Sequence, residues 1–111
     1  MILVVREPAT ADQRREMLES LSVYIKVAVD IQEGILAGGG VMHADCEAVL
    51  LEAGSRQEDI WGADWIPEEQ QVRFEALINI RPKQGNRRLE IEAPALRAKV
   101  EAIVRRLLGD A

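Results

Sequence analysis

The chain has 111 residues, of which 48% are hydrophobic and 30% charged, and its formal net charge is −5. This length suits one domain, residues 1–111, with a core of its own, and the composition excludes a disordered chain. The acidic total argues against binding duplex nucleic acid, and no apolar run approaches the roughly 20 residues that span a bilayer, so we expect no membrane association.

In the first half, residues 2–5 read as a short buried strand, and Thr10 with Gln13 forms a capping pair for a helix. Residues 23–31 alternate apolar and polar, the pattern of a strand with one buried face. Residues 32–34 would turn the chain into a second strand at 35–37, although a helix through 30–37 is the alternative.

In the second half, residues 44–53 have helical periodicity, with Asp45 as a candidate cap and Gly54 at the C-terminal end. Residues 60–66 and 72–81 read as antiparallel strands joined by a polar turn. A final helix begins near Pro94, has one apolar face and ends at Gly109.

These elements predict an α+β fold: a single antiparallel-rich sheet of about five strands, covered by two or three helices that include an amphipathic C-terminal helix. The first strand, the first helix and the second strand could instead form a right-handed parallel crossover at one side of the sheet.

The most distinctive segment is a loop with four cations and no acid, which we call the basic loop, residues 79–88. Pro82 fixes one backbone angle and Gly85 permits a left-handed conformation, so the cations sit on a shaped turn. Guanidinium groups suit carboxylate or phosphate oxygens, which predicts a site for a small anion or an acidic partner group. The proposed chief donors are Arg81, Asn86 and Arg87, supported by Asn79, His43 and Asp45.

Ion pairing within the chain is the competing interpretation of these arginines. Arg73 would pair with Asp64 across the predicted hairpin, and Arg81 or Arg87 would pair with Glu90 or Asp30.

The segment around the single histidine, His43, places four potential ligand types within five residues. One histidine and one cysteine make a weak metal site, so we predict no metal, and no cofactor motif is present. Cys46 is a poor nucleophile between two acids. As the only cysteine, it also excludes an internal disulfide and favours a cytoplasmic location. A hydrolase or RNA-cleaving enzyme that uses His43 with Arg81 is a further hypothesis, which no spacing selects.

Trp61 and Trp65 would share one face of a strand, together with Ala63. A core position is favoured for both rings, with Gly62 allowing a neighbour to approach closely. If a ring were exposed, the two tryptophans and the C-terminal helix would build the interface of a homo-oligomer, the alternative function.

Residues 43–62, H-A-D-C-E-A-V-L-L-E-A-G-S-R-Q-E-D-I-W-G, and residues 78–87, I-N-I-R-P-K-Q-G-N-R, resemble a family of short prokaryotic proteins catalogued as a domain of unknown function. The resemblance extends over nearly the whole chain and implies no activity. Its motif residues correspond to His43, Asp45, Ser55, Gln57, Asp59, Trp61, Gly62, Asn79, Arg81, Pro82, Asn86 and Arg87.

Overall fold

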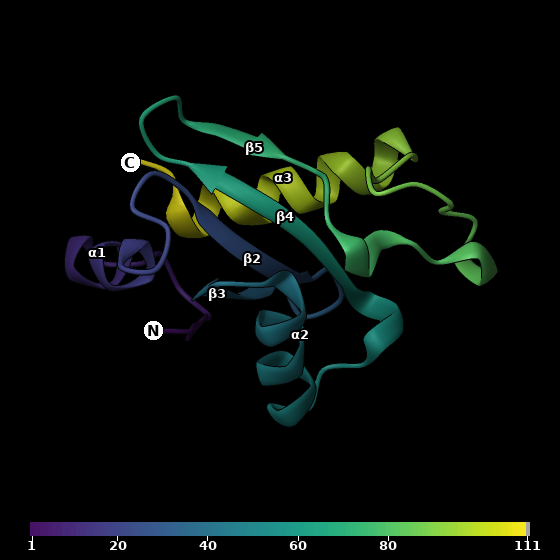
Figure 1. Cartoon of the computed structure of the whole chain (residues 1–111), viewed down its shortest axis with the longest axis horizontal. Helices are drawn as coiled ribbons and strands as arrows, with labels where there is room; N and C mark the ends of the chain where they lie inside the picture. Colours follow the sequence, from purple (N-terminus) through teal and green to yellow (C-terminus); the bar gives the residue numbers. More distant parts are fainter. Residues whose placement is uncertain (111) are drawn as a thin grey trace.

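One five-stranded sheet forms the centre of the protein, in a computed structural model that describes residues 1–110 (Figure 1). Its strand order is β1-β3-β2-β4-β5, and every neighbouring pair is antiparallel. The strands are β1 (Leu3–Val5), β2 (Ile25–Asp30), β3 (Ile35–Gly40), β4 (Ile60–Ile66) and β5 (Gln71–Arg73). The predicted α+β class and the five-stranded antiparallel sheet are confirmed.

Three helices cover this sheet on both faces (Figure 1). They are α1 (Ala11–Leu18), α2 (His43–Glu52) and α3 (Pro94–Leu108), and three short 3₁₀ turns complete the elements: η1 (Gln57–Asp59), η2 (Leu77–Asn79) and η3 (Pro82–Gln84). The predicted capping box of Thr10 and Gln13 begins α1, and Pro94 begins α3. Within the described residues, no helix is both long and apolar enough to cross a membrane.

The core has two parts, one on each face of the sheet. On one face, α1 and α3 pack through Met17 and Val100 against odd-numbered residues of β2 such as Val27. On the other face, α2 packs through Leu50 against Ala28. The prediction that β2 has only one buried face is therefore wrong: as a central strand lying between helices on both sides, it is buried on both.

Strand pairing excludes the parallel crossover considered for the N-terminal part. β1 pairs with β3, not with β2, and it does so antiparallel. β2 and β3 form the predicted hairpin, in place of the alternative helix through 30–37. Asp30 stabilises its turn, because the carboxylate accepts hydrogen bonds from the backbone N–H groups of Gln32 and Glu33 at 2.9 and 3.0 Å.

The predicted strand over residues 72–81 is wrong beyond Arg73. After β5 the chain leaves the sheet and forms η2 and η3. Asn79 explains this departure, because its buried side-chain amide bonds both backbone groups of Gly62 in β4. A side chain thus satisfies the β4 groups that a longer β5 would have paired.

Candidate functional site

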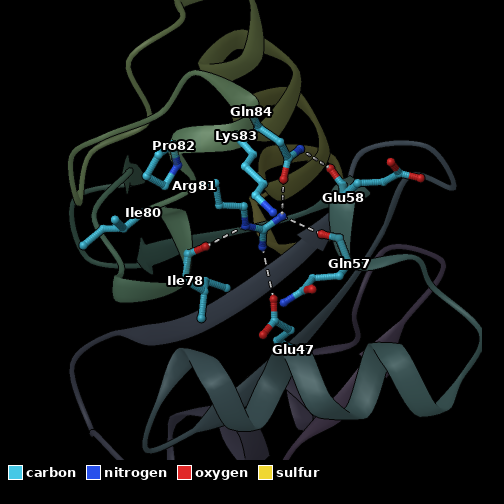
Figure 2. A pocket seen from close by; sticks show the side chains of 9 residues that line it. All are labelled: Glu47, Gln57, Glu58, Ile78, Ile80, Arg81, Pro82, Lys83 and Gln84. Carbon is cyan, nitrogen blue, oxygen red and sulfur yellow. Dashed lines mark hydrogen bonds and ion pairs between the residues drawn. The ribbon is translucent and has the colours of Figure 1, made fainter.

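A pocket of about 580 Å³ lies between α2 and the chain that follows β5 (Figure 2). Three segments build it: one turn of α2, the η1 turn, and the end of η2 with η3. Its lining residues are Glu47, Gln57, Glu58, Ile78, Ile80, Arg81, Pro82, Lys83 and Gln84. We call it the α2 pocket. It contains the central part of the predicted basic loop.

Arg81 forms part of the wall of this pocket, and most of its hydrogen-bonding capacity is already used. Its Nε donates to the Ile78 carbonyl at 2.9 Å, and its Nη1 donates to the Gln57 carbonyl at 2.5 Å and to Gln84 Oε1 at 3.3 Å. Its Nη2 donates to Glu47 Oε2 at 3.1 Å (Figure 2). A guanidinium has five N–H donors, so these four bonds leave one Nη2 hydrogen without a partner among residues 1–110.

The charge of Arg81 is balanced from inside the protein. The side chains of Arg81 and Glu47 are only 10% and 13% exposed. Burial lowers the pKa of Arg81 from its ordinary value, while the negative charge of Glu47 opposes that change. The guanidinium carbon also lies 4.9 Å from the centroid of the Trp61 ring. Arg81 therefore joins α2, η1 and β4 to the basic loop.

The turn within the basic loop is closed by backbone hydrogen bonds. The backbone N–H of Arg81 donates to the Asn86 carbonyl at 2.6 Å, and the backbone N–H of Asn86 donates to the Arg81 carbonyl at 3.1 Å. Gly85, at the tip of the turn, has a φ of +81°. The inference that the cations sit on a shaped turn is consistent with this geometry, since a left-handed residue is favourable only for glycine and a few others.

The two predicted asparagine donors point into the protein. Asn79 is fully buried, and its Nδ2 also donates to the carbonyls of Phe74 and Leu89. Asn86 is 4% exposed; its Nδ2 donates to the carbonyls of Asn79, Arg88 and Glu90, and its Oδ1 accepts from Glu92 N–H at 2.8 Å. Both amides hold the backbone of the loop.

The remaining predicted site residues occupy three different environments. Arg87 is exposed and is not part of the pocket lining, and its backbone N–H bonds Glu92 Oε2 at 2.6 Å. Asp45 is exposed in the first turn of α2; the N-cap is Met42, so the prediction that Asp45 caps this helix is wrong. His43 lies one helical turn before Glu47, which places it beside the α2 pocket.

His43 is fixed by two acceptors on β4. Its Nε2 lies 2.8 Å from Asp64 Oδ1 and 3.0 Å from the Ala63 carbonyl, so Nε2 carries the proton. The ring lines a smaller pocket, of about 160 Å³, with Lys26, Met42, Ala44, Leu77 and Ile78. Arg81, which the hydrolase hypothesis combines with His43, lines the α2 pocket and not this smaller one.

Arg81 does pair with an acid of this chain, as the competing interpretation predicted. The predicted partners of the arginines, however, are wrong. Arg73 does lie opposite Asp64 in the β4–β5 register, but the Asp64 carboxylate binds His43. Arg81 pairs with Glu47, and Glu90 pairs with Arg97. No spacing pattern identified Glu47, because it lies 34 residues before Arg81.

Trp61 and Trp65 are core residues, as the sequence favoured, with exposures of 3% and 0%. Both belong to the face of the sheet that α1 and α3 cover, together with Ala63. Gly62 between them allows the predicted close approach, since a Cβ there would lie 2.5 Å from Ala76 Cβ. The two rings therefore offer no contact surface, and the interface prediction is wrong in this respect.

Cys46 is buried, and its thiol donates to the Lys26 carbonyl at 3.5 Å. Burial raises the pKa of this thiol from its ordinary value, and the nearby Asp45 carboxylate adds to the rise. Within residues 1–110, the His, Cys, Asp and Glu side chains form no group of three or more that could hold a metal ion.

A pocket residue that sequence reasoning did not select is Lys83, although it belongs to the basic loop. Sequence reasoning also missed the apolar lining by Ile78 and Ile80, because both fall within the predicted strand over residues 72–81.

A family model described as "Protein of unknown function (DUF5674)" matches residues 3–107. No curated protein and no solved structure matches the chain significantly.

Proposed function

Because the chain belongs to the DUF5674 family, whose description assigns no function, we propose a function from the site itself: the α2 pocket binds an anionic group carried on an apolar body. The group is a carboxylate or a phosphate, and Lys83 is its chief partner. The spare Nη2 hydrogen of Arg81 is a second donor. This refines the predicted site, in which Arg81, Asn86 and Arg87 were the chief donors.

The observation that carries the proposal is the contrast between Lys83 and the other charges of the pocket. Glu47 is paired with Arg81, and Glu58 with Arg56 at 2.6 Å. Lys83 lines the same pocket and makes no ion pair with any residue from 1 to 110. An ammonium group without an acidic partner beside apolar surface favours an anionic ligand.

The apolar part of the ligand follows from the wall of the pocket. Ile78, Ile80 and Pro82 line it, and the Ile80 side chain is 44% exposed. Covering such surface with an aliphatic or aromatic group releases free energy of about 25 cal/mol per Å² removed from water. Inorganic phosphate or sulfate would leave this surface uncovered, so organic anions should bind more tightly.

A thermal-melt series on the full chain tests the proposal. Benzoate and hexanoate are compared with benzamide, hexylamine and inorganic phosphate, each up to 20 mM at constant ionic strength. A ligand at about 100 times its Kd adds about 2.7 kcal/mol of stability, which raises Tm by several degrees. We expect the carboxylates to raise Tm and the neutral or cationic analogues to have no effect.

The matched variants are Lys83→Ala and Lys99→Ala. Lys99 is exposed on α3, outside the α2 pocket, and removal of either lysine changes the net charge equally. The rise in Tm that the carboxylates cause should disappear in Lys83→Ala and persist in Lys99→Ala. Equal shifts in both variants, or no shift in the wild type, would reject the proposal.

Two further predictions stay untested alongside it. The single cysteine predicts a cytoplasmic location. Self-association is the second prediction, and the buried tryptophans would not form its interface. Sedimentation velocity of the purified chain measures the second directly.

A further inference from the structure

The α2 pocket and the smaller pocket beside His43 are neighbours. The two share Ile78 in their linings, and the same helix borders both, through Glu47 in the first and through His43 and Ala44 in the second. Since His43 and Glu47 are one helical turn apart, the two hollows follow one another along α2. We call the pair the α2 groove.

Exposed apolar side chains gather along this groove. Met42 is 51% exposed, Leu77 is 70% exposed and Ile80 is 44% exposed, and all three line one of its two hollows. Leu77 has the most exposed large apolar side chain among residues 1–110. A small ligand inside the α2 pocket would leave Met42 and Leu77 uncovered. Contiguous apolar surface of this kind marks interaction sites.

The two hollows each contribute one lysine that lacks an acidic partner. Lys26 lines the smaller hollow and Lys83 the larger, and neither forms an ion pair within the part of the chain described. Asp64, which lies opposite Lys26 in the β2–β4 register, is held by His43 at 2.8 Å. The two carboxylates that line the groove, Glu47 and Glu58, are thus each paired with an arginine, while its two ammonium groups have no acidic partner among residues 1–110.

We propose that the α2 groove binds an extended, acidic and apolar peptide segment of another protein. In this segment, two acidic side chains lie on either side of apolar ones: the acids pair with Lys26 and Lys83, and the apolar side chains cover Met42, Leu77 and Ile80. The proposal rests on the proposed function, because the anionic group in the α2 pocket becomes one of the two acids. Charge complementarity of this kind favours the correct register and disfavours basic partners.

The experiment is a selection from a library of displayed 12-residue peptides against the full-length protein, followed by fluorescence polarisation with the enriched peptides. We expect enriched sequences in which acidic residues flank apolar ones. Their Kd should rise at least tenfold in Lys26→Ala and in Lys83→Ala, and in Leu77→Ser, but less than twofold in Lys99→Ala. Because Leu77 and both lysines are partly or largely exposed, these variants should fold, and circular dichroism verifies this.

Each contrary result has a definite meaning. No enrichment, or binding that all variants share, overturns the peptide proposal. A second result would be that carboxylates no longer raise Tm in Lys83→Ala, while Lys26→Ala and Leu77→Ser bind the peptides as tightly as the wild type. In that case the small-ligand function stands and the peptide proposal fails. If sedimentation shows a dimer that Leu77→Ser dissociates, the groove binds a second copy of this chain, and the proposal of a different partner is overturned.

Discussion

The side-chain amide of Asn79 binds the backbone of Gly62 at both ends: Asn79 Oδ1 accepts from Gly62 N–H at 2.8 Å, and Asn79 Nδ2 donates to the Gly62 carbonyl at 3.0 Å. This pair ends the sheet beyond β5 and turns the following chain toward α2. The position of the α2 pocket depends on it, because Ile78 and Ile80 flank Asn79.

Asn79→Ala should destabilise the protein by about 3 kcal/mol, since buried polar groups that lose their partners cost about 1–3 kcal/mol each. Gly62, Phe74 and Leu89 all lose a hydrogen bond to this side chain. Urea denaturation measures the change. Leu77→Ala in the same 3₁₀ turn is the control and should shift stability by no more than about 0.5 kcal/mol, because the side chain is largely exposed. Equal effects of the two variants would contradict the bracing role of Asn79.

Gly62→Ala should destabilise the protein by about 1–3 kcal/mol through overpacking. The added methyl group would meet Ala76 Cβ at 2.5 Å and Ile78 at 3.0 Å. In the double variant Gly62→Ala/Ala76→Gly the closest of these contacts is removed, so we expect much of the stability to return in urea titrations. If the double variant loses as much free energy of unfolding as the two single variants together, this contact is not the cause.

Arg81→Met should cost about 3 kcal/mol of stability, because it leaves the Glu47 carboxylate buried without its partner. Adding Glu47→Gln removes that charge, so the double variant should be more stable than Arg81→Met alone. The exposed pair of Arg15 and Asp12 provides the control, and Arg15→Met should change stability by less than about 1 kcal/mol. A double variant less stable than Arg81→Met would contradict the charge argument. For the same reason, Lys83 is the better residue for a binding test.

Cys46 should react slowly with a thiol reagent in the native state. At pH 8 the native protein should react at least 100-fold more slowly than the urea-unfolded chain, because the thiol is buried and its raised pKa lowers the thiolate fraction. Comparable rates in the two states would place the thiol at the surface.

The raised pKa of Cys46 also predicts a pH dependence of stability. In the unfolded chain the thiol ionises near its ordinary pKa of about 8.5, and in the folded protein only at higher pH. Its contribution is therefore complete below about pH 8 and is lost as the pH rises through the folded-state pKa. The free energy of unfolding should fall less steeply above pH 8.5 in Cys46→Ala than in the wild type; parallel slopes would contradict this.

Local patterns predicted those features that depend on neighbouring residues alone. The capping box of Thr10 and Gln13 and the proline at the start of α3 are set by contacts within one helical turn. The tight turn at Gly85 likewise follows from the positive φ that glycine adopts without strain. The five strands and the amphipathic final helix followed from periodicity, and the antiparallel class followed from the short connections between paired strands.

Tertiary structure alone decided the site. The sequence determined that cations gather between residues 81 and 88, but the partner of Arg81 on α2 lies 34 residues away in the chain, and no local pattern encodes that contact. The alternation after Arg73 predicted a strand; the Asn79 amide instead satisfies Gly62 in β4 and directs Ile78 and Ile80 to the pocket. Buried backbone groups must find a partner, and which side chain supplies it depends on which elements pack together.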